Sequence, residues 1–536
     1  MKPLIVDALA AGRGRRRTTR DVIGAGPRSV AGVLEERGFE PRIAVAKDVL
    51  EGRAELENYD LLLVSGMTSD LTAVRRSISR WRTASTGPAV VGGPITSNPR
   101  DALIRARGDL AVIGEGEQTI KDLLDLGLDR ERMPDREELA KVLGIAYLDR
   151  GAIHVTGLRP AMRREDYDRL TPSTEAVKDY PLHHAARVYV EVLRGCSNYI
   201  RAKDALPEEA CGGCGRCTSG GLEERYDCPR GIPPGCGYCS VPSLYGPPRS
   251  RSSEKILEEV RGLLSEGVRR VVLSAPGFLD FGRDLLVEPE PLTDPRSPEP
   301  NYEALEELLS RLTGLDEFSE GAASLMMENV KGCLVTERAA ALMGRYMPGT
   351  PVNLGFETGS ETHAAQIGRP STPAENLSAV RKLKEVGLKP YVYFIHGLPG
   401  QSSETVEATV RAMDNAVEAG ASRVILYRFQ PLPMSAFNDR PRAPPAVRDE
   451  LSNRIYRAAR RANRALKEEM VGRTLRVVVA EPYDRDRSFQ VAYPLLHGPV
   501  VLLEGAEGME GRVVEAVITG VTSDRIVRGC LRGAMF

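Results

Sequence analysis

Arg194-Gly195-Cys196-Ser197 and, further along, Cys236-Gly237-Tyr238-Cys239 enclose an interval of 39 residues (197–235) that holds four more cysteines. Seven of the nine cysteines in the chain therefore lie between positions 196 and 239. We expect this large chain to stay in a reducing compartment, where clustered cysteines favour metal binding over disulfides. The stretch is therefore predicted to be a metal-binding region around which the catalytic fold is built.

The seven cysteines divide into two ligand sets. The first is Cys196, Cys236 and Cys239, and the second is Cys211, Cys214, Cys217 and Cys228. Three thiolates on a four-iron cluster leave one iron open to an outside ligand, whereas four complete the shell of a zinc or a cluster. The first set is predicted to act on a bound molecule, and the second to hold a shape or pass electrons. The alternative is two zinc knuckles without radical chemistry.

The residues around the first set resemble the cluster loop of radical S-adenosylmethionine (SAM) enzymes. The resemblance is closest to the methylthiotransferases, in which RGC, an aromatic residue before the last cysteine, a Val-Pro pair and an R-S-R segment occur in this order. Here these are Arg194 to Cys196, Tyr238, Val241-Pro242 and Arg249 to Arg251. That family separates its first two cysteines by three residues, so residues 197–235 are interpreted as an insertion, and Cys196 must return to Cys236.

The resemblance implies a [4Fe-4S] cluster on the first set, with SAM bound to the open iron. One electron, from a donor such as ferredoxin or flavodoxin, would cleave SAM into methionine and a 5′-deoxyadenosyl radical. Segments similar to the family's SAM-binding turns imply cofactor contacts at Tyr238, Ser274, Glu357, Gly359, Ser360, Gly397 and Gly400. No catalytic residue is identified beyond the cluster ligands.

Residues 1–125 alternate apolar runs with amphipathic helical patterns, as in PLIVDAL (3–9) and YDLLLVSG (59–66). This alternation predicts a doubly wound, Rossmann-like parallel sheet. Its strand-end turns SGMT (65–68), GGP (92–94) and GEGE (114–117) resemble the cobalamin-binding domain that precedes many radical SAM domains. The connection after the first run contains a basic segment, RGRRRTTR (13–20), which is interpreted as a solvated loop, with phosphate binding as the alternative.

Cobalamin is an open prediction for this domain. None of the six histidines follows an aspartate by two places, so the D-x-H-x-x-G form of cobalamin binding is not expected. The domain either binds cobalamin without that histidine or retains only the fold. Residues 1–125 also lack cysteine, which counts against an ordinary methylthiotransferase, because those enzymes carry three cluster cysteines there.

Residues 126–187 are interpreted as a linker with a hairpin at 145–157, and strand–helix alternation resumes over residues 188–465. Six strand-plus-helix units are too few for a closed eight-unit barrel and predict an open (β/α)6 partial barrel. The strand runs are RVYVEVL (187–193), RRVVLSAP (269–276), AASLMME (322–328), PVNLGFE (351–357), KPYVYFIH (389–396) and RVILYRF (423–429). The cysteine region follows the first run, as the family resemblance requires.

Residues 466–536 contain Val-rich runs bounded by Gly and Pro, which predicts a small β-barrel. The segment is similar to the TRAM domain, which binds RNA in several RNA-modifying enzymes. Candidate RNA contacts are Arg473, Arg476, Arg485, Arg487, Arg512, Arg525, Arg528, Tyr483 and Phe489. The alternative is a barrel that only packs on the catalytic domain.

Composition limits the remaining possibilities. The chain has 536 residues, 42% hydrophobic and 27% charged, as in ordinary soluble proteins, and a net charge of -1 gives no whole-chain case for nucleic acid. No apolar run reaches the length of a membrane span, so we expect a cytoplasmic protein without a membrane partner.

Three functions are consistent with these patterns. The first is a radical SAM enzyme that modifies RNA, by methylation or methylthiolation of a tRNA base. The second is a cobalamin-dependent radical SAM methyltransferase that acts on a small molecule or lipid. The third is a non-catalytic metal- and RNA-binding protein that retains the fold.

Overall fold

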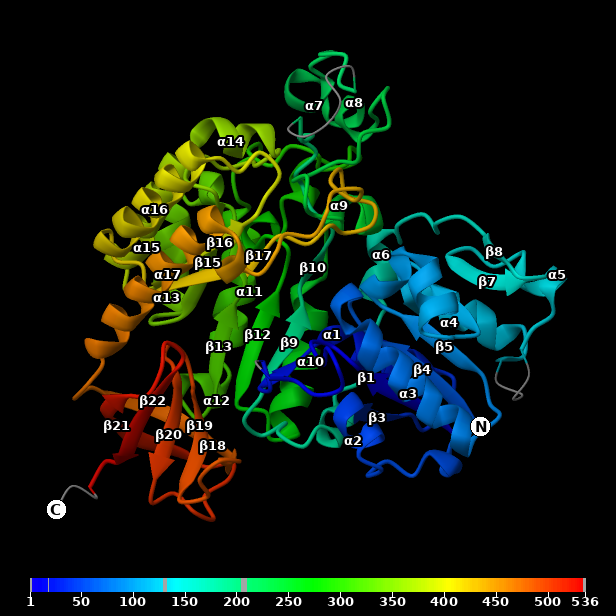
Figure 1. Ribbon diagram of the computed structural model, residues 1–536, viewed down its shortest axis with the longest axis horizontal. Helices are drawn as coiled ribbons and strands as arrows, with labels where there is room; N and C mark the ends of the chain where they lie inside the picture. The colour runs from blue at the N-terminus through cyan, green and yellow to red at the C-terminus, as the bar shows by residue number, and fades with distance from the viewer. Residues whose placement is uncertain (1, 18, 129–132, 204–209, 534–536) are drawn as a thin grey trace. The chain divides into compact units, whose positions relative to one another are not determined.

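The computed structural model describes residues 2–17, 19–128, 133–203 and 210–533 (Figure 1). The chain divides into two compact units. Unit 1 comprises Met1–Val190 with Glu254–Val268, and unit 2 comprises Glu191–Ser253 with Arg269–Phe536. Among the helices of the described ranges, every one is too short or too polar to cross a bilayer.

Unit 1 is built on a seven-stranded sheet in the order β3-β1-β4-β5-β6-β7-β8. The first five strands in this order are parallel, and β7 and β8 join antiparallel. The parallel strands are mostly buried, which is why they appear in the sequence as continuous apolar runs. The strands are β1 (Pro3–Asp7), β3 (Arg42–Val45), β4 (Leu61–Ser65), β5 (Ala89–Gly92), β6 (Leu110–Val112), β7 (Ile145–Asp149) and β8 (Ala152–Val155).

The predicted hairpin is present as β7 and β8, and it extends the sheet of unit 1 beyond β6. Arg150 and Gly151 both have positive φ, 48° and 85°, as a two-residue hairpin turn of type I′ requires. The sequence analysis predicted the turn but not the pairing with β6.

The helices of unit 1 bury one apolar face each. In α3, Ala73, Val74, Ile78 and Trp81 recur at helical spacing and are buried. A buried ion pair, Arg28 Nη2 to Glu259 Oε1 at 2.7 Å, joins α1 to α10. The helices are α1 (Ala25–Glu36), α2 (Ala46–Leu50), α3 (Leu71–Ala84), α4 (Gly116–Asp125), α5 (Arg136–Leu139), α6 (Arg164–Asp168) and α10 (Ser253–Ser265).

Unit 2 contains the parallel strands of a partial barrel, which confirms the predicted fold class. β12 (Arg270–Ser274) pairs with β13 (Ser324–Met327), and a second parallel sheet has the order β14-β15-β16-β17. Every one of the six predicted strand runs forms a strand, the first of them β9 (Arg187–Glu191), at the boundary of the two units. The second sheet consists of β14 (Asn329–Val330), β15 (Pro351–Glu357), β16 (Lys389–His396) and β17 (Arg423–Arg428).

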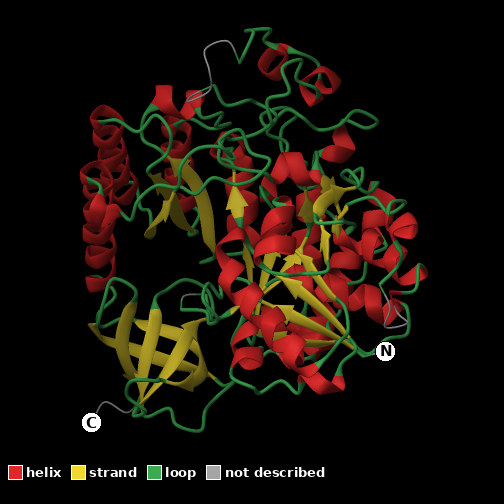
Figure 2. Ribbon diagram, turned by 45° about the vertical axis from the view of Figure 1, so that its right-hand side comes forward, coloured by secondary structure: helices red, strands yellow, loops and turns green. Residues whose placement is uncertain are grey.

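Helices alternate with these strands, as in a (β/α) barrel (Figure 2). Several begin with a side-chain cap: Thr372 accepts a hydrogen bond from the amide of Glu375 at the start of α15. The principal helices are α11 (Tyr302–Thr313), α13 (Glu337–Tyr346), α14 (Glu361–Gln366), α15 (Pro373–Glu385), α16 (Ser403–Glu418) and α17 (Glu450–Glu468).

The C-terminal part of unit 2 is a closed five-stranded barrel, as predicted. The strands follow the order β18-β19-β20-β22-β21 and enclose a core that includes Val477, Val501 and Leu503. The sequence analysis did not predict β19, whose FQVAYP run lacks the Val-rich pattern of the others. The strands are β18 (Thr474–Pro482), β19 (Phe489–Pro494), β20 (Val500–Glu504), β21 (Val513–Val521) and β22 (Ile526–Leu531).

Candidate active site

Two short paired strands flank the cysteine region in the sequence. β10 (Leu193–Arg194) pairs antiparallel with β11 (Arg249–Ser250), so the R-S-R segment lies beside the residues that precede Cys196. The amide of Cys196 donates to the carbonyl of Gly246 at 3.1 Å. Gly195 has a φ of +91°, and a Cβ atom there would lie 2.1 Å from the carbonyl oxygen of Pro247. Only glycine therefore fits immediately before Cys196.

The insertion leaves the site and returns to it at adjacent residues. The amide of Gly235 donates to the carbonyl of Ile200 at 3.0 Å, and Arg201 and Gly235 form an isolated parallel bridge. The described part of the insertion contains α7 (Arg216–Ser219) and α8 (Leu222–Tyr226).

The buried guanidinium of Arg201 holds the insertion through backbone carbonyls. It donates to the carbonyls of Arg225 at 2.5 Å, Tyr226 at 3.0 Å and Ile232 at 3.3 Å. A guanidinium has five N–H donors, so one side chain can satisfy several carbonyls that would otherwise be left without a partner.

Asn198 lies between two thiols of the first set. Its backbone N–H lies 3.5 Å from Cys196 Sγ, and its Nδ2 lies 3.3 Å from Cys236 Sγ. The amide of Cys239 donates to the carbonyl of Cys236 at 2.8 Å, which places the third cysteine in the same turn. The chain therefore returns Cys196 to Cys236 across the 39 residues 197–235, as the family resemblance required.

Burial makes these thiols weak acids. It raises the pKa of Cys196 above its ordinary value, although the nearby Lys331 offsets part of that effect. Burial and the charge of Cys236 raise the pKa of Cys239 to about 12. Both thiols are protonated at neutral pH in the metal-free chain, so metal binding there must release protons.

The N–H donors around the thiols are compatible with a cluster. Within the described ranges, no three His, Cys, Asp or Glu side chains are placed to hold one metal ion, the first set included. A single tetrahedral ion would bring its thiolates to about 4 Å from one another, whereas a four-iron cluster binds each thiolate at a different iron. Three neighbouring thiols with N–H donors at 3.3–3.5 Å from two of them suit the cluster.

The cysteines of the second set differ in exposure. Cys211 and Cys228 pack against an apolar cluster that includes Ile232 and Phe437, whereas Cys214 is exposed. A zinc or iron–sulfur site formed by Cys211, Cys214, Cys217 and Cys228 stays a prediction.

Arg369 joins Cys236 to two of the predicted SAM-binding residues. Its Nη1 lies 3.3 Å from Cys236 Sγ, 3.0 Å from Tyr238 Oη and 3.8 Å from Glu357 Oε1. Burial raises the pKa of Glu357, and Arg369 counteracts this only in part. Glu357 also has a φ of +65°, a conformation that non-glycine residues adopt at a cost. The sequence analysis missed Arg369, although IGRPST (367–372) is similar to the M-x-R segment of methylthiotransferases.

A buried charged group lies on the other side of Cys196. The Nζ of Lys331 contacts the carboxylate of Asp280 and lies 2.9 Å from Ser197 Oγ. Arg283 Nη1 donates to Asp280 Oδ1 at 2.6 Å. Burial tends to raise the pKa of Asp280, but these two cations bring it below its ordinary value. The group therefore carries a net positive charge beside Cys196, and no local sequence pattern indicated it.

The remaining predicted SAM-binding residues have local structural roles. Ser274 Oγ donates to Glu328 Oε2 at 2.8 Å, and Ser360 accepts from the amide of His363 at the start of α14. A Cβ atom on Gly359 would lie 2.2 Å from the carbonyl oxygen of Ala408. Gly397 and Gly400 have φ of +73° and +80°, as tight turns require. Contact of these five residues with SAM stays a prediction.

Unit 1 has a separate candidate site at the carboxyl ends of its parallel strands. Asp70 accepts hydrogen bonds from the amides of Ala10, Gly12 and Met67, which fixes the connection that follows β1. A Cβ atom on Gly92 would meet no other atom within 4 Å, so the end of β5 faces open space. Ligands of doubly wound sheets bind at such strand ends.

The segment after β1 resembles the cobalamin motif except at one position. It reads Asp7-Ala8-Leu9-Ala10-Ala11-Gly12, which matches D-x-H-x-x-G with leucine in place of histidine. Asp7 is buried and accepts from Arg16 Nη2 at 2.7 Å and from the Tyr180 hydroxyl at 2.9 Å. The open end of β5 suits a corrinoid, but Leu9 offers no nitrogen to cobalt.

Two segments of the chain match models of known protein families. Residues 226–413 match the model of the radical SAM superfamily. The chain belongs to the radical SAM superfamily. Membership implies a [4Fe-4S] cluster and SAM as cofactors. Residues 16–124 of this radical SAM protein match the B12 binding domain, which supports cobalamin as a further cofactor.

Two curated relatives and one solved structure are similar to this radical SAM protein. An uncharacterised protein of Methanopyrus kandleri is 45% identical, over 98% of this chain and 95% of the relative. The ribosomal protein uS12 methylthiotransferase RimO of Moorella thermoacetica is 27% identical, over 53% of this chain and 61% of the relative.

The solved structure is that of the radical SAM methyltransferase TsrM from Kitasatospora setae, with cobalamin and a [4Fe-4S] cluster bound. It has a TM-score of 0.58 at 15% identity and covers 82% of this chain and 77% of that chain. At this identity the likeness concerns the fold alone. The resemblance of the C-terminal barrel to a TRAM domain stays a prediction.

Proposed function

We propose that this chain is a cobalamin-dependent radical SAM methyltransferase. The observation that supports the proposal best is the presence, in one chain, of two thiols that contact Asn198, a third cysteine in the same turn as Cys236, and a B12-binding-type sheet whose β5 ends in open space. No cysteine precedes Cys196 in the sequence, which favours methyl transfer over methylthiolation, because methylthiotransferases carry a second cluster in their N-terminal domain.

The residues of the chain have distinct roles in this proposal. Cys196, Cys236 and Cys239 would hold the cluster, while Asn198 and Arg369 donate hydrogen bonds to its thiolates. The carboxyl ends of β1, β4 and β5 would hold the corrinoid. When bound, the cluster supplies an electron to SAM and the corrinoid supplies a carrier for the methyl group.

Anaerobic reconstitution tests the proposal directly. Protein loaded with iron, sulfide and hydroxocobalamin should retain about one corrinoid per chain after gel filtration. It should also consume SAM under reductant, with methionine and 5′-deoxyadenosine measured by mass spectrometry. Cys236→Ser should abolish SAM consumption, whereas Cys530→Ser, in β22, should not. Failure to retain corrinoid, or undiminished SAM consumption by Cys236→Ser, would refute the proposal.

RNA is the substrate that the C-terminal barrel favours. The guanidinium of Arg528 lies 5.5 Å from the ring centre of Phe489, which gives a cation beside a stacking surface. Arg485, Arg487 and Arg528 are exposed, whereas Arg476 donates to the carbonyl of Gly321 at 2.8 Å. Barrels that bind single-stranded nucleic acid combine such cations with aromatic rings. We therefore propose a structured RNA such as tRNA as the methyl acceptor.

Binding of bulk tRNA at several salt concentrations tests this substrate. Arg485→Ala/Arg528→Ala should weaken binding about tenfold or more and lower the salt slope by about two, because each lost phosphate contact contributes about one to the slope. The matched control is Arg381→Ala/Arg411→Ala, which removes two exposed arginines from α15 and α16. Equal effects of the two variants would contradict an RNA-binding role for the barrel.

A further inference from the structure

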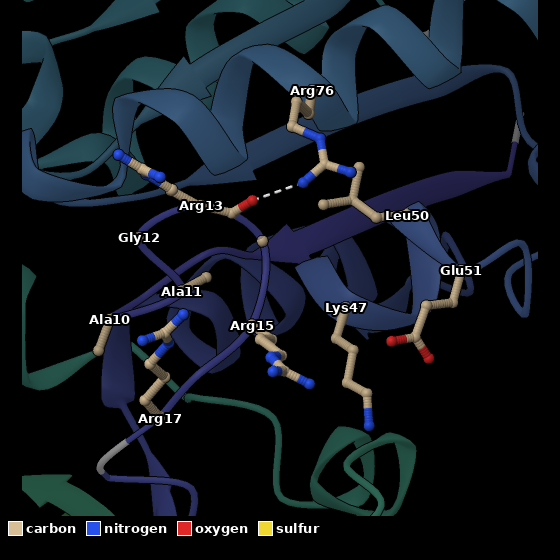
Figure 3. A pocket seen from close by; sticks show the side chains of 11 residues that line it. Ala10, Ala11, Gly12, Arg13, Arg15, Arg17, Lys47, Leu50, Glu51 and Arg76 are labelled. Atoms are coloured by element: carbon tan, nitrogen blue, oxygen red, sulfur yellow. Dashed lines mark hydrogen bonds between the residues drawn. The ribbon is translucent and has the colours of Figure 1, made fainter.

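Unit 1 contains a pocket of about 530 Å³ between the connection after β1 and the helices α2 and α3 (Figure 3). Its walls include Ala10, Ala11 and Gly12 from the connection and Leu50 from α2. The volume lies within the range of small-molecule sites in proteins. Ser65 and Gly92, which end β4 and β5, do not line it, so the pocket shares only the connection after β1 with the candidate corrinoid site.

Five cationic side chains line this pocket: Arg13, Arg15, Arg17, Lys47 and Arg76. The only acidic residue among the lining residues is Glu51, whose carboxylate pairs with Arg53 outside the pocket. Arg53 also pairs with Asp48, so Glu51 keeps its negative charge, and the residues that line the pocket carry five positive charges and one negative charge. Such a concentration of charge attracts a polyanion.

Arg76 is held by a backbone carbonyl rather than by an acidic partner. Arg76 Nη1 donates to the carbonyl of Arg13 at 2.6 Å, as the dashed line in Figure 3 marks. The connection itself is fixed by Asp70 through the amides of Ala10 and Gly12. Within the described residues, the structure records no ion pair for the side chains of Arg13, Arg15, Arg17 and Lys47.

Arg16, in the same basic run, differs from the arginines that line the pocket. Arg16 is largely buried, pairs with Asp7 at 2.7 Å and donates to the carbonyl of Leu9 at 2.7 Å, so its role is structural. Its neighbours Arg15 and Arg17 are exposed and line the pocket. The solvated loop that the sequence analysis preferred therefore fits the exposed Arg15 and Arg17 but not Arg16, which is largely buried.

We propose that this pocket binds a ligand of nucleotide size that carries two or more adjacent phosphate groups. A single phosphate would leave most of the positive charge uncompensated, whereas a polyphosphate carries several charges within reach of the five cations. Free nucleoside polyphosphates and the backbone of an RNA share this chemistry. The pocket shares the connection after β1 with the candidate corrinoid site, and the other residues that line it come from α2 and α3. Binding of phosphate there does not depend on the proposed methyl transfer.

Calorimetry with full-length protein and three probes tests the proposal: sodium pyrophosphate, ATP and a 12-nucleotide single-stranded RNA. Pyrophosphate or ATP should bind the wild-type protein, and Arg15→Glu/Lys47→Glu should weaken that binding at least tenfold. The matched control is Arg75→Glu/Lys141→Glu, which makes the same charge change at exposed residues outside the pocket and should leave the affinity within about twofold.

Competition experiments identify the source of the phosphates and can overturn the proposal. Displacement of pyrophosphate by ATP but not by RNA supports a free nucleotide, and displacement by RNA supports a phosphodiester backbone. Hydroxocobalamin carries a single phosphodiester, and its competition with pyrophosphate would make the pocket part of the corrinoid site and overturn the proposal. Absence of pyrophosphate and ATP binding at millimolar concentration, or equal weakening by the control variant, would also overturn it.

Discussion

Asn198 Nδ2 lies 3.3 Å from the Sγ of Cys236, so a residue at the start of the insertion contacts a cysteine on the far side of it. The same Nδ2 lies 2.9 Å from the carbonyl oxygen of Gly368, which fixes the orientation of the amide. This contact links the 39-residue interval (197–235) to the chemistry of the site and leads to the first prediction.

Asn198→Ala should lower the reduction potential of the reconstituted cluster. Hydrogen bonds to cluster sulfurs stabilise the more negative, reduced state. Loss of one bond of about 1 kcal/mol corresponds to about 40 mV for one electron. Titration followed by electron paramagnetic resonance measures the shift, with Asn415→Ala, at an exposed position in α16, as the control. An unchanged potential at normal iron content would show that the amide does not act on the cluster.

Lys331→Met should destabilise unit 2 by about 3 kcal/mol, because it breaks a buried ion pair with Asp280 and leaves Ser197 without its ammonium donor. The partly exposed Lys255 of α10, in unit 1, whose Nζ lies 2.9 Å from Glu258 Oε2, is the control, and Lys255→Met should cost less than about 1 kcal/mol. Thermal unfolding followed by circular dichroism compares the two variants. Similar midpoints for both would mean that the buried group adds little stability.

Arg201→Met should release the insertion while the rest of unit 2 stays folded. The substitution removes the donors to the carbonyls of Arg225, Tyr226 and Ile232, at a cost of about 1–3 kcal/mol for each carbonyl left without a partner. Trypsin should then cut after Arg225 or Arg230 at least tenfold faster than in the wild-type protein, as read by mass spectrometry. Arg216→Met, in α7, provides the control. Unaltered cleavage would indicate that other contacts hold the insertion.

Acid should weaken the fold through His497. Burial and the neighbouring cations Lys389 and Arg423 lower the pKa of His497 to about 4, and Tyr391 Oη lies 2.8 Å from its Nδ1. An unfolded histidine titrates near about 6.5, so between these values the unfolded chain binds more protons than the folded one. Above about pH 6.5 the histidine is neutral in both states, and the free energy of unfolding is unaffected by its titration. As the pH falls towards 4, protonation of the unfolded chain lowers the free energy of unfolding by up to about 3 kcal/mol.

His497→Gln removes this titration and tests the assignment. Its unfolding midpoint should fall less steeply between pH 6.5 and 4.5 than that of the wild-type protein, because glutamine takes up no proton. Parallel midpoint curves for the two proteins would exclude His497 as the source of the acid sensitivity.

Much of the fold could be predicted because its signals are local. Buried parallel strands such as β4 and β16 form continuous apolar runs, and turns such as that of Arg150 and Gly151 require particular residues. Two features could not be predicted in this way. β19 has a mixed composition, and β7 pairs with β6 through a tertiary contact that the sequence of neither strand specifies.

The candidate site likewise contains residues that a local motif indicated and residues that only tertiary contacts bring together. The cysteines and Tyr238 belong to a short motif, so their spacing indicated them. Lys331 contacts Ser197 across 134 positions, and Arg369 contacts Cys236 across 133, so their proximity depends on the order of strands in the barrel. Local patterns carry no information about such contacts, and the structure was needed to find them.

The bridge between Arg201 and Gly235 has a consequence for the history of this chain. A segment whose two ends meet can grow, shrink or be exchanged during evolution without any shift in Cys196 and Cys236, which lie outside it. Residues 202–234 are therefore expected to be exchangeable as one segment. A chimera that carries a different module between the same two anchor points should assemble the same reaction centre.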